Sequence, residues 1–145
     1  KKWYDNNRLR IHSFYSGGVL HGKHMEFHYN GAVVTDATYK NGNLHGLYRK
    51  FYPNGKLEIE TSYVDGLIDG LYRSYDNKGN LMHEYTCFQG VIHGEKKQYY
   101  PDGTLRFVGS YNYGTPVGIS IEYDRKGNPI IVRLHDEKAR AEMYL

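Results

Sequence analysis

Histidines are the residues of this chain whose type and spacing first suggest chemistry. Three of the eight recur in one series: His21, His45 and, two intervals later, His93. His24 and His28 form a second pair. If these segments are β-strands, equivalent positions of neighbouring hairpins lie about 10 Å apart, and residues four apart on one strand lie about 13 Å apart. Zinc holds its ligands at about 2 Å, so we predict no metal site and ordinary surface or turn histidines.

Catalysis would need a nucleophile beside a base, or two close carboxylates. Glu60 and Glu84 recur at the same interval, again about 10 Å apart in a sheet, and we predict both on the sheet face that carries Lys50 and Ser62. The single cysteine, Cys87, excludes an internal disulfide and is predicted to be a packed residue. A thin sheet has no deep pocket to exclude water. We therefore predict no enzyme activity and no cofactor.

A column of aromatic residues beside a column of basic ones is the strongest candidate for a binding surface. The aromatic column is Phe27, Phe51, Tyr75, Tyr99 and Tyr123, and two residues earlier stand Met25, Arg49, Arg73, Lys97 and Ile121. Two interpretations stay open. The cationic stems cover or stack on the rings, or the surface is a groove with a basic spine for an acidic partner. The predicted partner-binding residues are Arg49, Phe51, Arg73, Tyr75, Lys97, Tyr99, Tyr63 and Tyr111.

The elements that position these residues follow from the glycines. Fifteen of the seventeen lie in three series, each with a step of 24 residues and no insertion or deletion. The series are Gly18, Gly42, Gly66, Gly90 and Gly114; Gly22, Gly46, Gly70, Gly94 and Gly118; and Gly31, Gly55, Gly79, Gly103 and Gly127. A unit this short cannot bury its own apolar surface, so neighbouring units must stack into an elongated array.

Turn chemistry makes each unit a β-hairpin. Pro53, Asn54 and Gly55 suit a type I turn that ends in a left-handed glycine, whereas VDGLIDG predicts a wider connection between hairpins. Strand alternation then predicts two faces. One carries Leu47, Arg49, Phe51, Leu57, Ile59, Thr61 and Tyr63 and is the apolar face. The other carries Tyr48, Lys50, Tyr52, Glu58, Glu60 and Ser62.

The predicted fold is all-β: a single-layer, elongated antiparallel sheet forming one domain over residues 1–145. Residues 1–17 are a partial N-terminal unit, and residues 18–135 are five 24-residue hairpin repeats. Residues 136–145 are rich in helix formers behind Asp136, which predicts a short C-terminal helix that caps the last strand.

Composition limits the remaining function classes. The formal charge of +3 is modest and the charges are interspersed, which argues against nucleic acid as a partner. No apolar run approaches the roughly 20 residues of a membrane span. The chain begins KKWY, so a cytoplasmic location and a periplasmic or anchored one, after removal of an N-terminal segment, both stay open.

The repeat NGNLHGLYRKFYPNGKLEIETSYVDG resembles MORN repeats, and most closely the bacterial variant found in antitoxins of the YwqK family. The resemblance covers Trp3 to about His135. It implies a non-enzymatic protein-binding module, an antitoxin or immunity-like protein that masks a partner such as a toxin. Contact with anionic phospholipid and architectural self-association are the alternatives that MORN proteins suggest. We expect a monomer or a weak homo-oligomer.

Overall fold

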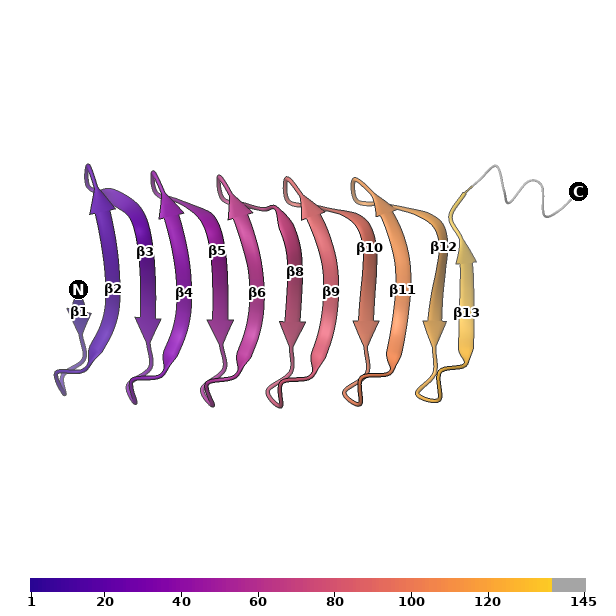
Figure 1. Ribbon diagram of the computed structural model, residues 1–145, viewed down its shortest axis with the longest axis horizontal. Helices are drawn as coiled ribbons and strands as arrows, with labels where there is room; N and C mark the ends of the chain where they lie inside the picture. The colour runs from indigo at the N-terminus through magenta and orange to yellow at the C-terminus, as the bar shows by residue number, and fades with distance from the viewer. Residues whose placement is uncertain (137–145) are drawn as a thin grey trace, which may run out of the picture.

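The computed structural model describes residues 1–136 as one open antiparallel sheet in which consecutive strands are neighbours (Figure 1). The short strand β7 lies off this path and pairs with β6. The strands are β1 Lys2–Trp3, β2 Leu9–Ser16, β3 Val19–Phe27, β4 Val33–Lys40, β5 Asn43–Phe51, β6 Leu57–Val64, β7 Leu67–Ile68, β8 Gly70–Tyr75, β9 Leu81–Phe88, β10 Val91–Tyr99, β11 Leu105–Asn112, β12 Thr115–Tyr123 and β13 Pro129–Leu134.

This architecture confirms the predicted all-β, single-layer array of hairpins. The strand pairing follows the order of the chain, except that β8 rather than β7 continues the sheet from β6, as expected for a repeat array whose units contact their neighbours. Residues 137–145 of the predicted C-terminal helix lie outside the described residues. Among residues 1–136 there is no helix with the length and apolarity that a membrane crossing requires.

One end of each hairpin has the predicted turn. The Tyr52 N–H donates to the Lys56 carbonyl at 2.8 Å, and the Gly55 N–H donates to the Tyr52 carbonyl at 2.9 Å. Gly55 has a φ of 82°, which glycine adopts without the steric cost of a Cβ. The same pair of hydrogen bonds closes the turns at residues 28–32, 76–80, 100–104 and 124–128.

The other end of each hairpin is tighter than predicted. Asn41 and Gly42 have φ values of 50° and 85° and lie between the paired residues Lys40 and Asn43. Two consecutive left-handed residues close a two-residue type I′ turn, whose twist matches that of the strands. The prediction of a wide connection was therefore wrong. The second glycine of the motif, Gly46, instead lies within β5.

The histidine series supports these tight turns. His45 Nδ1 accepts a hydrogen bond from the Asp65 N–H at 3.4 Å, and His93 Nδ1 accepts one from the Tyr113 N–H at 3.2 Å. Both donors are left-handed residues of the next turn. In the third unit Asp69 takes the place of histidine and accepts from the N–H of the next turn at 3.2 Å. Histidine or aspartate therefore supplies the acceptor in these units, whereas Val117 takes the same position in the fifth unit, and the predicted turn role is confirmed for these histidines.

A β-bulge in each hairpin decides which side chains share a face. Between β5 and β6 the register shifts after Lys50, so that Lys50 opposes Ile59 while Phe51 opposes Leu57, and Glu58 is the extra residue. Directly opposed residues share a face, so the shift exchanges the two sides of β6 relative to simple alternation. The predicted faces were wrong for this reason: Arg49 lies with Glu60 rather than with Thr61.

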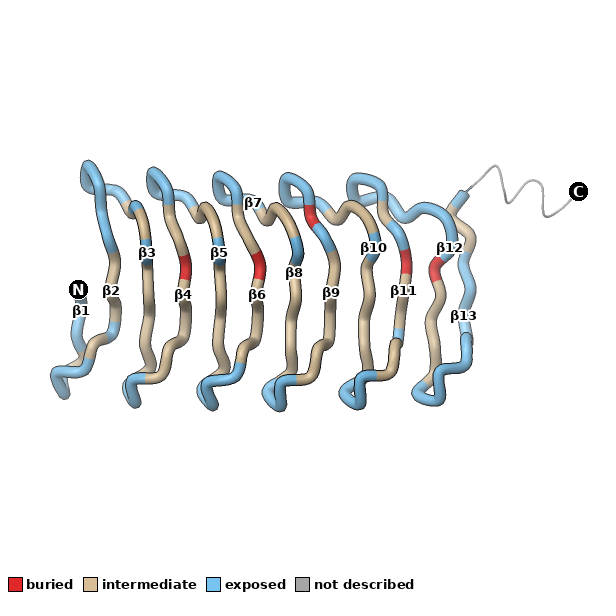
Figure 2. The backbone as a smooth tube through the Cα atoms, in the orientation of Figure 1, coloured by how far each residue is buried: buried red, intermediate tan, exposed pale blue. Residues whose placement is uncertain are grey.

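The sheet therefore has two different faces. We call one the tyrosine face; the tyrosines that define it are Tyr39, Tyr48, Tyr63, Tyr72, Tyr85 and Tyr111. Its buried residues are small, and most lie midway along the strands, whereas Cys87 lies near the end of β9 (Figure 2). Tyr48, for example, opposes Ala37 on one side and Thr61 on the other, and these two are 0% and 2% exposed. Cys87 is also buried, as predicted. The core is thus a half-buried layer of rings over small side chains.

Candidate functional site

The opposite face, which we call the charged face, carries a row of alternating charges. Each member directly opposes the next across adjacent strands from β4 to β10. In order, the row is Asp36, Arg49, Glu60, Arg73, Glu84 and Lys97. The basic column seen in the sequence is therefore interleaved with acidic residues from the intervening strands.

Each of the three cations of this row forms an ion pair on the charged face. Arg49 Nε donates to Glu60 at 2.8 Å, and Arg73 Nε donates to Glu84 at 2.7 Å. Lys97 Nζ lies 2.6 Å from a Glu95 carboxylate oxygen, and this hydrogen bond raises the pKa of Lys97. Because each cation already has a carboxylate, the row offers an incoming anion little free positive charge.

The structure separates the predicted partner-binding residues into two groups. Arg49, Arg73 and Lys97 belong to the charged row, and strand alternation places Phe51, Tyr75 and Tyr99 on the same face. Tyr63 and Tyr111 oppose Gly46 and Gly94 on the tyrosine face. The eight residues therefore do not form one groove. Glu60 and Glu84, predicted on the face of Lys50, lie on the other one.

Ring contacts join the two strands within hairpins on the tyrosine face. Tyr72 and Tyr85 oppose each other on β8 and β9 and stack with ring centroids 4.6 Å apart. Tyr48 and Tyr63 meet edge to face at 5.6 Å. Offset and edge-to-face pairs are the favoured geometries of aromatic rings. The result is a row of rings whose inner sides cover the small buried residues.

Burial raises the pKa of these phenols further above physiological pH. Desolvation, with a smaller effect from neighbouring Tyr72, raises the pKa of Tyr85 to about 12. Desolvation also raises the pKa of Tyr48 and of Tyr63. Each hydroxyl therefore stays an uncharged group that can both donate and accept a hydrogen bond at physiological pH.

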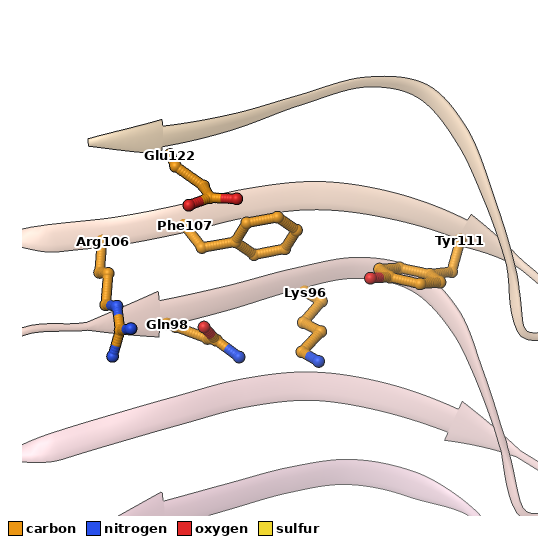
Figure 3. A pocket seen from close by; sticks show the side chains of 6 residues that line it. All are labelled: Lys96, Gln98, Arg106, Phe107, Tyr111 and Glu122. Carbon is orange, nitrogen blue, oxygen red and sulfur yellow. The ribbon is translucent and has the colours of Figure 1, made fainter. Parts of the chain in front are cut away.

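The row of rings ends at a hollow of about 300 Å³ over β10, β11 and β12 (Figure 3). Its lining residues are Lys96, Gln98, Arg106, Phe107, Tyr111 and Glu122. We call it the β10–β12 hollow. Sequence reasoning found only Tyr111 among them. The available signal was Gly109, which falls outside the three glycine series. It directly opposes Lys96 across the strands, and the Phe107 ring occupies the place that its side chain would take.

No group of three or more histidine, cysteine, aspartate or glutamate side chains within residues 1–136 is placed to hold a metal ion. His24 contacts Ser13 at 2.8 Å and Glu26 at 3.1 Å. His83 contacts Ser74 at 2.9 Å. These histidines thus have hydrogen-bonding roles within the sheet.

The comparisons agree with the repeat described above. A search of the curated proteins finds no match to the chain. Three segments, residues 20–41, 44–65 and 92–113, match the family model described as the MORN repeat variant. Their starting positions keep the register of the 24-residue step. Three segments of the array are therefore similar to MORN repeats of this variant.

Proposed function

We propose that this chain is a non-enzymatic binding module and that its tyrosine face holds a protein partner. The observation that carries the proposal is the row of half-buried rings on a sheet with no second layer over it among the described residues. Tyrosine gives a large, rigid contact with a polar end, and it is enriched among residues that dominate binding energy.

The ion pairs favour this face over the groove predicted from the sequence. A partner that binds Arg49 or Arg73 has to compete with Glu60 or Glu84 for the same guanidinium. The same pairing disfavours a lipid surface as the main target, because attraction to anionic headgroups depends on accessible positive charge. The six predicted residues on the charged face stay a prediction for a second, weaker surface.

The resemblance to YwqK-type antitoxins supports a narrower form of the proposal, in which the partner is a toxin that the tyrosine face masks. Co-expression tests this form: the chain should restore growth to cells that produce the product of the neighbouring gene. Growth arrest that the chain leaves unchanged would count against the toxin and leave the protein-binding proposal standing.

Affinity purification with three baits tests the general proposal. The baits are the wild-type chain, a Tyr63→Ala/Tyr72→Ala variant and an Arg49→Gln/Arg73→Gln variant, each used on an extract of the source organism. We expect one protein to be retained by the wild type and the arginine variant and lost from the tyrosine variant. Equal retention by all three baits, loss with the arginine variant only, or no enriched protein would contradict the proposal. Circular dichroism should show that all three baits are folded.

A further inference from the structure

The β10–β12 hollow contains two cations that have no acidic partner among residues 1–136. Lys96 Nζ lies over the rings of Tyr85 and Tyr111, at 6.0 and 5.9 Å from their centroids. The Arg106 guanidinium lies over Tyr100 at 5.8 Å. Within residues 1–136 neither side chain forms an ion pair with a carboxylate. This differs from the charged row, whose arginines are both paired.

The lining of the hollow presents donors to one side. Figure 3 shows the nitrogen-bearing ends of Lys96, Gln98 and Arg106 on one side of Phe107 and the Glu122 carboxylate on the other. That carboxylate is occupied, because Arg133 donates to it. The free groups of the hollow are therefore two cations with an amide beside them.

In the second unit, the residues equivalent to Gln98 and Arg106 form an ion pair with each other. Lys50 and Glu58 stand two repeats before Gln98 and Arg106. Lys50 Nζ contacts the Glu58 carboxylate at 3.3 Å. In the fourth unit an arginine replaces the acid and an amide replaces the lysine, so the internal pair is absent. The same two positions thus form an ion pair in the second unit and carry an amide and a cation in the fourth.

Two further observations concern the packing of Phe107 and the positive charge of the hollow. A Cβ on Gly109 would come within 2.8 Å of the Phe107 ring and 3.1 Å of Ser120, so the ring lies in space that a side chain would need. Burial lowers the pKa of His83, and the charges of Lys96 and Arg106 lower it further. His83 directly opposes Gln98, and it therefore reports positive potential at this place.

We propose that the β10–β12 hollow receives an acidic side chain, a glutamate or an aspartate, from the protein segment that docks on the tyrosine face. This inference rests on the proposed function and names the chemistry of the partner. A carboxylate matches the fork of Arg106 and the ammonium group of Lys96. The hollow lies within the face, beside the rings, where a segment laid across the strands reaches it more easily than a flat bilayer does.

A peptide titration followed by backbone amide NMR tests the inference. The probe is an acetylated and amidated hexaglutamate, and hexaglutamine of the same length is the uncharged control. At low salt we expect hexaglutamate to shift the amides of β10 and β11 around Lys96, Gln98 and Arg106, and hexaglutamine to cause no saturable shift. Arg106→Glu places an acid where the second unit has one, so we expect it to weaken hexaglutamate binding at least tenfold.

Two more variants separate a built site from general attraction. Lys40→Glu makes the same change in net charge on distant β4 and should retain wild-type affinity. Lys96→Gln makes a smaller change within the hollow and should also weaken binding. It provides the test if Arg106→Glu fails to fold. Equal losses in Lys40→Glu and Arg106→Glu, or shifts centred on the charged row, would overturn the inference.

Anionic probes of other classes complete the design. Inorganic phosphate or vesicles containing phosphatidylserine should bind more weakly than hexaglutamate, and tighter binding of either one would replace the acidic segment with a phosphate ligand or a lipid surface. The inference fails alone if the three-bait purification succeeds and hexaglutamate does not bind the hollow. If hexaglutamate binds the hollow but no protein depends on Tyr63 and Tyr72, the proposed function fails instead.

Discussion

The hairpin of the second unit, β5 with β6, and that of the fourth unit, β10 with β11, have one backbone and different chemistry. Both have the same turn hydrogen bonds and the same register shift before the last strand residue. On the tyrosine face, however, several positions differ; Ile59, for example, corresponds to Phe107. Tyr48, Lys50, Glu58 and Thr61 of the second unit correspond to Lys96, Gln98, Arg106 and Gly109 of the fourth.

The difference shows how a repeat array can acquire a local site. Turn glycines, acceptors and bulges fix the backbone of each unit, and each unit contacts only its neighbours. Side chains outside these positions are then free to change in one unit without altering the others. The second unit fills its face with rings and an internal ion pair, whereas the fourth leaves a hollow with unpaired cations.

The largest effect on stability should come from alkaline pH, and it should be greater for the tyrosine-rich second unit. The raised pKa values mean that the folded state retains the phenolic protons of Tyr48, Tyr63 and Tyr85 where the unfolded state has lost them. Their stabilising contribution is complete below pH about 10 and is lost as pH rises through the folded-state values. Circular dichroism with phenolate absorbance should show unfolding in that range.

A Tyr48→Phe/Tyr63→Phe variant is the control for this prediction. It removes two titrating groups from the second unit, so its stability should fall less steeply above pH 10 than that of the wild type. An unchanged slope would show that the alkaline transition arises elsewhere.

Replacing Gly109 of the fourth unit with threonine, the residue at the same position of the second unit, should be the most damaging single substitution proposed. Gly109→Thr forces a side chain against Phe107 and Ser120, and overpacking of this kind costs about 1–3 kcal/mol. Urea unfolding measures the change in the free energy of unfolding. Ser110→Thr adds a methyl group at the exposed neighbour and should change stability little; a loss as large as that of Gly109→Thr would rule out the packing explanation.

The buried hydroxyl of the second unit offers a stabilising change. Thr61 is 2% exposed, and its Oγ1 has no hydrogen-bond partner. Thr61→Val keeps the shape and removes the unsatisfied polar group, which should raise the free energy of unfolding by about 1 kcal/mol. Thr61→Ser keeps the hydroxyl and removes a methyl group, so it should lower stability by about 0.8 kcal/mol. Changes of the same sign in thermal unfolding would contradict this interpretation.

Loss of the turn acceptor should affect both units alike. His45→Ala and His93→Ala each leave a turn N–H without its protein acceptor, and each should cost about 0.5–1 kcal/mol of unfolding free energy. His45→Asp restores an acceptor, as Asp69 does in the third unit, and should recover part of the loss. A histidine-specific role would leave the aspartate variant as unstable as the alanine one.

The smallest effect is expected in the charged row, which passes through both units. Arg49 and Glu60 are partly exposed, and such pairs contribute about 0.2–1 kcal/mol. A double-mutant cycle with Arg49→Gln and Glu60→Gln should give a coupling at the low end of this range, and it should shrink in 0.5 M salt. A coupling well above about 1 kcal/mol would contradict a minor role for this ion pair in stability.

The candidate surface could be predicted from the sequence only in part. The aromatic and basic columns are visible in the sequence because they recur at one interval, but their partners are on neighbouring strands. Glu60 stands 11 positions after Arg49, and its pairing with that arginine depends on a register that the sequence does not display. The cations of the hollow were missed for a related reason, since Lys96 and Arg106 do not recur as basic residues in the units beside them.

The sequence by itself determined the hairpin repeat, its step of 24 residues, the order of the strands and the packed state of Cys87. These follow from local signals: turn residues, glycine positions and the need of a short unit to pack on its neighbours. The tertiary structure alone decided which side chains share a face. One extra residue at the Glu58 position of every hairpin reverses the side on which the return strand presents its residues, and that shift depends on cross-strand pairing rather than on local propensity.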